Sequence, residues 1–122
     1  MMATMRYLVD DVEVSVRFYT DLLGFELLER FGPAMAIVRQ GDLDLWLAGP
    51  MSSAARPMPD GARPCAGGWN RFVVTTEAIE GLVERLVDAG ARFRGEIVSG
   101  PGGKQILLED PSGNVVELFQ PA

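Results

Sequence analysis

The sequence contains no histidine and a single cysteine, and these two shortages limit the chemistry open to it. A disulfide within one chain and a cysteine-based zinc site both need more than one cysteine. Cys65 also has no histidine to act as its base, so we expect no catalytic cysteine. One cysteine in 122 residues is typical of a reducing compartment.

Long apolar runs and clusters of basic residues are also missing. No apolar run approaches the roughly 18 residues of a membrane span, and the first eleven residues lack the apolar region of a signal peptide. The formal net charge is −6, and the eleven lysines and arginines are scattered along the chain. A nucleic-acid partner would need a clustered basic surface. The sequence therefore predicts a cytoplasmic protein with neither a membrane nor a nucleic acid as partner.

Two stretches carry apolar residues at helical spacing, and each ends at a glycine. The first begins after a predicted cap at Asp10 or Asp11 and ends at Gly24. The second has Thr76 as its predicted cap and ends at Gly90. The two stretches are residues 10–25 and residues 75–93. Both are predicted to be amphipathic helices.

Each predicted helix follows one short strand-like run and precedes three more, so the unit βαβββ is written twice. An offset of 67 residues relates Val12 to Ile79, and one of 72 relates Gly41 to Gly113. The predicted strands are residues 4–9, 25–31, 34–40 and 42–48, then residues 71–75, 92–98, 104–110 and 114–120. The sequence predicts one α+β domain with module 1 at about 1–48, a linker at 48–69 and module 2 at about 69–122.

The predicted linker is rich in proline, glycine and alanine and is longer than a usual connection. Its methionines, Met58 among them, would suit an adaptable apolar lid over a ligand. The same composition is also found in plain surface segments and in contacts with a second chain. Both interpretations stay open.

Several predicted strands are apolar on both faces. One face must pack against the helices, so the other face needs cover from a cavity that the sheet encloses or from a partner chain. We therefore expect a curled sheet around a cavity, and a homodimer that closes its open edges. Trp46 alternates with Leu45 and is expected to pack under the helices.

The stretches VDDVEVSVRFYTDLLGFEL and LLEDPSGNVVELFQP resemble the two signature ends of the glyoxalase / bleomycin-resistance / extradiol-dioxygenase superfamily, whose members have the vicinal oxygen chelate fold. The resemblance covers nearly the whole chain. It implies two βαβββ modules forming a curled mixed sheet around a cavity. It does not imply one function, because that superfamily includes metal-dependent isomerases, lyases, transferases and dioxygenases as well as metal-free drug-binding proteins.

Members that bind a metal carry its ligands on the first and last strands of each module, and those positions are here Thr4, Leu45, Arg71 and Glu117. A divalent metal needs three or four donor atoms that converge on one point. Leucine has no donor and arginine is a permanent cation, so only Glu117 keeps the chemistry of a ligand. We expect no metal, no other cofactor and no catalytic residue.

In this fold the strands of Arg71 and Glu117 are neighbours, and we predict that the two side chains form an ion pair in the space that a metal would otherwise fill. The pair either contacts a ligand or only neutralises the cavity floor. Trp69 either stacks on a planar ligand or caps the core. The candidate ligand-binding residues are Arg71, Glu117, Thr4, Leu45, Arg6, Trp69, Phe119 and Met58.

Three functions fit these observations. The first is a metal-free binding protein that holds an apolar or aromatic natural product or antibiotic in a dimer cavity. The second is a lyase, isomerase or dioxygenase of the same fold with a divergent or absent metal site. The third is a scaffold dimer whose cavity is filled by its own side chains. The sequence favours the first.

Overall fold

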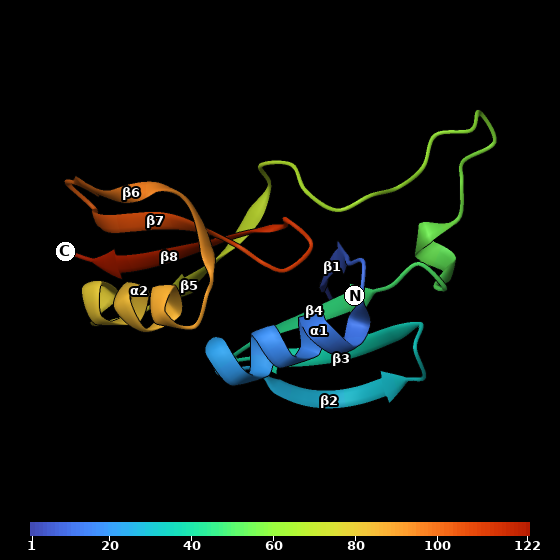
Figure 1. Cartoon of the computed structure of the whole chain (residues 1–122), viewed down its shortest axis with the longest axis horizontal. Helices are drawn as coiled ribbons and strands as arrows, with labels where there is room; N and C mark the ends of the chain where they lie inside the picture. The colour runs from blue at the N-terminus through green and yellow to red at the C-terminus, as the bar shows by residue number, and fades with distance from the viewer. The chain divides into compact units, whose positions relative to one another are not determined.

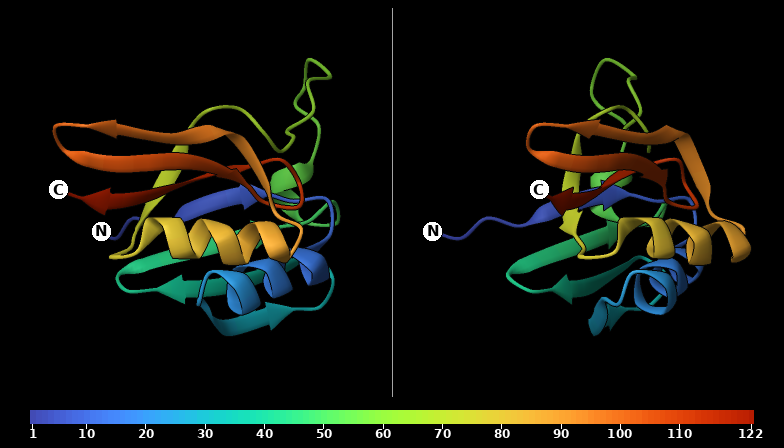
Figure 2. Two further views of the ribbon diagram at one scale, coloured as in Figure 1. Left: turned by 60° about the vertical axis from the view of Figure 1, so that its left-hand side comes forward. Right: turned by 90° about the vertical axis from the view of Figure 1, so that its left-hand side faces the viewer.

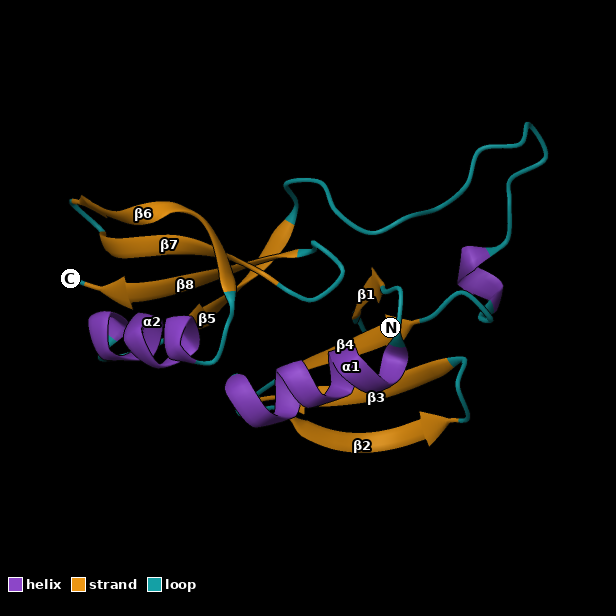
Figure 3. Ribbon diagram, in the orientation of Figure 1, coloured by secondary structure: helices purple, strands orange, loops and turns teal.

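The computed structural model describes all residues from 1 to 122, and they form two compact units, Met1–Gly67 and Gly68–Ala122. Each unit has one four-stranded mixed sheet and one α-helix (Figures 1 and 3). The expected α+β fold with two βαβββ modules is confirmed. The first unit contains β1 (Met5–Leu8), α1 (Val12–Arg17), η1 (Phe18–Leu22), β2 (Glu26–Phe31), β3 (Met35–Gln40), β4 (Leu43–Ala48) and η2 (Ser53–Ala55). The second contains β5 (Arg71–Thr75), α2 (Ile79–Asp88), β6 (Arg92–Gly100), β7 (Gly103–Glu109) and β8 (Val115–Pro121).

Both sheets have the same topology. Their strand orders are β1-β4-β3-β2 and β5-β8-β7-β6. The first strand of each unit pairs in parallel with the last, and the remaining pairs are antiparallel. A helix lies between the parallel partners in the sequence, as a parallel connection requires. This order places the strand of Arg71 directly beside the strand of Glu117.

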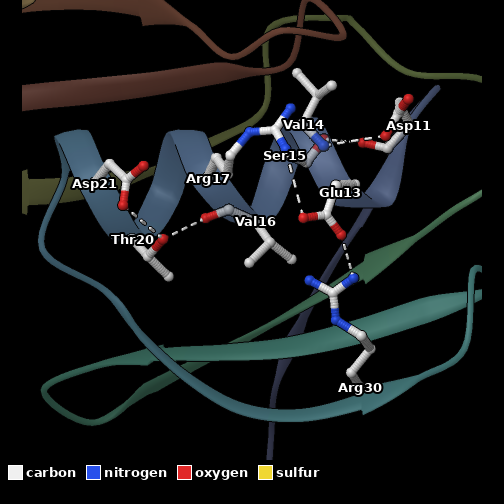
Figure 4. Close-up of polar contacts among 9 residues, drawn as sticks. All are labelled: Asp11, Glu13, Val14, Ser15, Val16, Arg17, Thr20, Asp21 and Arg30. Carbon is white, nitrogen blue, oxygen red and sulfur yellow. Dashed lines mark hydrogen bonds and ion pairs between the residues drawn. The ribbon is translucent and has the colours of Figure 1, made fainter.

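The first helix begins where the sequence predicts. Asp11 is its N-cap, with its carboxylate accepting a hydrogen bond from the Val14 amide at 3.0 Å (Figure 4). Glu13 forms ion pairs with Arg17 on the helix and with Arg30 on β2, which ties the helix to its sheet. The helical path continues as the π-helical turn η1 and stops before Gly24, which has a φ of 73°.

The second helix begins later than predicted, at Ile79. Thr76 is not its cap, because the Thr76 hydroxyl accepts only a 3.3 Å contact from the Ala78 amide outside the helix. The Ile79 amide instead donates to the side-chain oxygen of Gln120 on β8 at 2.8 Å. A residue 41 positions away therefore supplies the acceptor that the first turn needs. The predicted end at Gly90, with a φ of 86°, is confirmed.

Each helix packs on one face of its own sheet (Figures 1 and 2), and strand alternation separates this face from the helix-free face. In the first unit Leu45 and Leu47 are fully buried beside Val38 and Ala36 on the helix-covered face. Trp46 alternates with them and is only half-buried. The prediction that Trp46 packs under the helix is wrong, because Leu45 and Leu47 occupy that face.

In the second unit the helix-covered face carries Leu108, Val116 and Leu118, which are all fully buried. Glu117 alternates with Val116 and Leu118 and therefore lies on the helix-free face. We define that face by the strand-paired residues Arg71, Val73, Arg92, Arg94, Leu107, Glu109, Val115, Glu117 and Phe119. No helix of the chain is long and apolar enough to cross a membrane.

The first residue of β7, Gly103, has no room for a side chain. Gly103 has a φ of 143°, and a Cβ there would lie 2.1 Å from the backbone oxygen of Gln120. We expect Gly103→Ala to lower the free energy of unfolding by at least about 2 kcal/mol, because backbone must move to relieve the overlap. Gly102→Ala is the control, since nothing lies within 4 Å of its Cβ position. Chemical denaturation of both variants measures the difference, and equal costs would contradict the structure.

Candidate functional site

The predicted ion pair between Arg71 and Glu117 is confirmed. The Nε and Nη2 atoms of Arg71 lie 2.9 Å and 2.9 Å from Oε1 of Glu117. The side chains are 30% and 11% exposed, so the pair is largely removed from water. Both nitrogens converge on one carboxylate oxygen, which leaves Oε2 without a guanidinium donor. The pair therefore differs from a bidentate ion pair, in which two guanidinium nitrogens bind the two carboxylate oxygens.

A second arginine, which the sequence analysis missed, organises the adjacent part of the same face. Arg94 on β6 donates from Nε to Glu109 at 2.6 Å, from Nη1 to the Gly68 carbonyl at 2.7 Å and from Nη2 to the Gly113 carbonyl at 3.0 Å. Its guanidinium carbon also lies 4.6 Å from the ring centroid of Trp69. Arg94 therefore joins the end of the linker, two strands and a turn.

Trp69 connects the two arginines. Its ring stacks on Arg94, and its backbone carbonyl accepts a 3.3 Å hydrogen bond from Nη1 of Arg71. The residue is 67% exposed, so the interpretation of Trp69 as a cap over the core is wrong. The stacking of Trp69 on a ligand stays a prediction. Phe119 is half-buried on the same face of β8 as Glu117.

The first unit carries a related pair on its own helix-free face. Arg6 and Trp46 are register partners on β1 and β4, and the Arg6 guanidinium carbon lies 4.9 Å from the Trp46 ring centroid. Leu45 lies instead in the core, on the helix-covered face. The residue of β4 whose orientation matches that of Glu117 on β8 is thus Trp46, one position after the residue that the 72-residue offset selects.

The remaining predicted residues lie apart from these pairs. Thr4 precedes β1 and lines a shallow hollow of about 200 Å³ together with Arg39 and Asp44. Met58 is exposed in a compact turn of the linker, where its amide donates to the Ala62 carbonyl at 2.8 Å. A wider hollow of about 450 Å³, beside the start of α1, contains none of the predicted site residues.

The residues at the family's metal-ligand positions do not fit a metal. No three or more histidine, cysteine, aspartate or glutamate side chains gather closely enough to hold an ion. The carboxylate of Glu117 is already bound by Arg71, and a guanidinium has no lone pair to donate. The donor set therefore supports no step that depends on a metal.

Asp44 and Arg39 form a bidentate ion pair, unlike Arg71 and Glu117. Arg39 Nε lies 2.5 Å from Oδ1 and Nη2 lies 3.0 Å from Oδ2 of Asp44. The hydrogen bond from Arg39 lowers the pKa of the Asp44 carboxyl below its usual value of 3.8. Because the carboxyl pKa is lower in the folded state, the ion pair adds stability at pH values above the pKa of the unfolded state. This stability is lost as the pH falls through the pKa of the folded state.

The Asp44→Asn variant tests this pH dependence. We expect its melting temperature to lie below that of the wild type at about pH 7, and the difference to narrow as the pH falls below the usual carboxyl value of 3.8 toward about pH 2, because the wild-type carboxyl gains a proton in this range. Asp42→Asn, a change at an exposed residue of the turn that precedes β4, is the control. Thermal unfolding at both pH values measures the effect. A difference of the same size at both would show that the ion pair is not its source.

Comparisons with known proteins agree with this architecture. The family description "Glyoxalase/Bleomycin resistance protein/Dioxygenase superfamily" matches residues 2–118. Virulence protein STM3117 of Salmonella typhimurium is 26% identical over 128 aligned positions, which cover 92% of this chain and 78% of that protein.

Two solved structures show the same fold. Lactoylglutathione lyase from Agrobacterium tumefaciens superposes with a TM-score of 0.76 at 20% identity, over 98% of this chain and 92% of that one. TnmS3, an antibiotic binding protein from Streptomyces sp. CB03234, superposes with a TM-score of 0.69 at 25% identity, over 100% and 98%. The chain belongs to the Glyoxalase/Bleomycin resistance protein/Dioxygenase superfamily.

Proposed function

We propose that this protein binds an apolar or aromatic natural product or antibiotic without a metal and sequesters it in the cavity of a homodimer. The observation that carries the proposal is the ion pair between Arg71 and Glu117. The resemblance puts Arg71 and Glu117 at two of the positions where metal-dependent relatives carry ligands, and the Arg71 guanidinium supplies the positive charge that offsets the buried carboxylate of Glu117. Thr4 and Leu45 add no ligand pair that could compensate.

The surroundings of the pair suit a largely apolar ligand. Val73 and Phe119 lie on the same helix-free face as Glu117, and the exposed ring of Trp69 stacks on Arg94 of that face, so apolar and aromatic surface is present there. TnmS3, which this chain covers over 98% of its length, is an antibiotic binding protein, and this supports the same class of function for this chain. In the proposal, residues 48–69 join two modules of one domain and Met58 belongs to a lid.

The homodimer is supported by the outer strand of the first sheet. All six residues of β2 are exposed, including Leu27, Leu28 and Phe31. An exposed apolar edge strand is a surface that a second chain can cover. Light scattering at micromolar concentration should give twice the mass of one chain, and a stable monomer would contradict this part of the proposal.

A thermal shift assay tests the binding function. The purified protein, with and without prior chelator treatment, is screened against hydrophobic natural products and antibiotics. We expect at least one compound to stabilise the protein equally in both states, because a ligand at 100 times its Kd adds about 2.7 kcal/mol. Binding that needs an added metal, or a compound that is consumed, would identify an enzyme instead. No shift with any compound would favour the scaffold.

A further inference from the structure

We infer that Trp69, held by Arg94, and the nearby Arg71 select a planar aromatic ligand that carries an anionic oxygen, as a carboxylate or a phenolate. This inference rests on the proposed binding function and names the ligand class for it. Every residue that carries it lies in the second unit, within Gly68–Ala122.

The ring of Trp69 is exposed and stacks on Arg94. Tryptophan is usually well buried, yet here the residue is 67% exposed while one ring face rests on the Arg94 guanidinium at 4.6 Å. The opposite ring face is left for another planar group. Every flat aromatic group presents a π-face that can stack on an aromatic side chain, so such stacking tolerates many ring types. The ring is therefore suited to a flat aromatic ligand.

Arg94 acts as a positioning residue. All three of its nitrogens donate to acceptors from separate segments: the Glu109 carboxylate, the Gly68 carbonyl and the Gly113 carbonyl. A guanidinium fixed in this way has little freedom to turn toward a ligand. Its role is to hold the ring of Trp69 at one angle, because ordering the ring before binding lowers the entropic cost of stacking.

The charged residues on the helix-free face of the second sheet differ in balance from the whole chain. The helix-free face of the second sheet carries three arginines, Arg71, Arg92 and Arg94, against two glutamates, Glu109 and Glu117. Glu109 is shared by Arg94 at 2.6 Å and Arg92 at 3.9 Å. Among these strand-paired residues one positive charge therefore remains, in a chain whose formal net charge is −6; Glu96 lies in the irregular part of β6 and is not paired in the register. A local excess opposite in sign to the whole molecule favours an anion at this place.

Arg71 has one nitrogen, Nη1, that can donate a hydrogen bond to an anionic ligand oxygen. Arg71 binds Glu117 through Nε and Nη2, and its Nη1 makes only a 3.3 Å contact with the Trp69 carbonyl. That nitrogen carries two hydrogens and the contact with the carbonyl uses one, so the other can donate to a ligand oxygen while the ion pair stays intact. Because this carbonyl belongs to Trp69, the Trp69 ring and the Nη1 donor of Arg71 lie near each other. A flat aromatic ligand with an acidic oxygen at its edge can therefore stack on the ring and accept a hydrogen bond from Nη1.

Three probes test the ligand class by isothermal titration calorimetry. They are 2-naphthoate, which is flat and anionic, 2-naphthamide, which is flat and neutral, and cyclohexanecarboxylate, which is anionic but not flat. We expect 2-naphthoate to bind at least about tenfold more tightly than either of the others. Equal affinity for 2-naphthoate and 2-naphthamide would overturn the anion selectivity, and equal affinity for cyclohexanecarboxylate would overturn the stacking.

Variants separate the roles of the three residues. Trp69→Leu should weaken both naphthyl probes about tenfold, whereas Arg71→Met should weaken only 2-naphthoate. Arg94→Gln should weaken the binding of both naphthyl probes. Arg94→Lys should weaken it as well, because an ammonium group cannot reproduce the three hydrogen bonds. Arg85→Gln is the control and should change neither affinity by more than about twofold, since Arg85 is exposed on α2 and does not belong to the helix-free face.

A spectroscopic readout distinguishes positioning from plain folding. In a Trp46→Phe background Trp69 is the sole tryptophan, so its fluorescence anisotropy reports the motion of that ring alone. Arg94→Gln should lower the anisotropy while the far-ultraviolet circular dichroism stays unchanged. If Arg94→Gln fails to fold, Trp69→Leu still tests the stacking, because the three hydrogen bonds of Arg94 do not involve the Trp69 ring.

The failure of this inference can be told apart from the failure of the proposed function. Natural products that bind while 2-naphthoate does not, or binding that is unaffected by Trp69→Leu, would overturn the inference and leave the binding function standing. The absence of binding by every compound, naphthyl probes included, would overturn both.

Discussion

Replacing Arg71 by methionine should lower the free energy of unfolding by about 3 kcal/mol, the largest effect that we expect from any polar residue on the helix-free face. The reason is the glutamate that remains. The Glu117 side chain is 11% exposed, and both donors that approach it within 2.9 Å belong to Arg71. Removal of these donors leaves a carboxylate that is neither paired nor fully solvated, and urea denaturation measures the cost.

The double variant Arg71→Met, Glu117→Leu completes this test. Removing both charges together should bring the free energy of unfolding back to within about 1 kcal/mol of the wild type, because the buried carboxylate is then gone. Arg92→Met, on the same face but well exposed, should cost no more than about 0.5 kcal/mol. Additive effects of the two single changes would show that Arg71 and Glu117 do not depend on each other.

Replacing Asp110 by alanine should cost about 3 kcal/mol as well, for a different reason. Asp110 is 1% exposed in the turn between β7 and β8. Its carboxylate accepts hydrogen bonds from the Ser112 amide at 2.9 Å, from the Asn114 amide at 2.9 Å and from the Asn114 side chain at 3.1 Å. Without it, buried donors lose their acceptor just before the strand that carries Glu117.

Asp42→Ala provides the control for this change. Asp42 lies in the corresponding turn of the first unit, between β3 and β4, and is exposed. We expect its replacement to alter the free energy of unfolding by no more than about 0.5 kcal/mol. Chemical denaturation of the two variants side by side gives the comparison. Equal costs would mean that the burial of Asp110 is not what makes its carboxylate important.

The sequence predicted the elements of the fold well because each element has a local signal. All eight strands and both helices lie within a few residues of the predicted ranges. Asp11, Gly24 and Gly90 bound the helices as expected, since capping depends on neighbours three or four residues away. The start of α2 was missed because its acceptor, Gln120, belongs to another strand.

The faces of the strands were harder to predict. Trp46 and Leu45 are both apolar, so alternation alone does not say which of them packs against the helix. Only the register with Val38 and Ala36 of β3 settles the matter, and it depends on the length of the turn between β3 and β4. At Glu117 the ambiguity was smaller, because a carboxylate between Val116 and Leu118 is excluded from the apolar face.

The candidate site was predictable in one part and not in another. The pair of Arg71 and Glu117 followed from the resemblance, which makes their strands neighbours. Arg94 was missed because its three oxygen partners lie 15, 19 and 26 residues away, in a strand, a turn and the linker. The alternation of Arg92 and Arg94 along one strand was a weak signal that both point to the same face. Only the register of β6 with β7 shows that Arg94 lies near Glu109.

The most direct test of the account is a titration of the chelator-treated protein with Zn²⁺, Mn²⁺ and Fe²⁺, followed by calorimetry, with Glu117→Gln measured in parallel. We predict no stoichiometric site for any of the three ions, and no difference between the wild type and the variant, because the Arg71 guanidinium already offsets the charge of the carboxylate and no other metal-ligand side chains gather beside it. One ion bound per chain with a micromolar Kd, and lost on Glu117→Gln, would contradict the account.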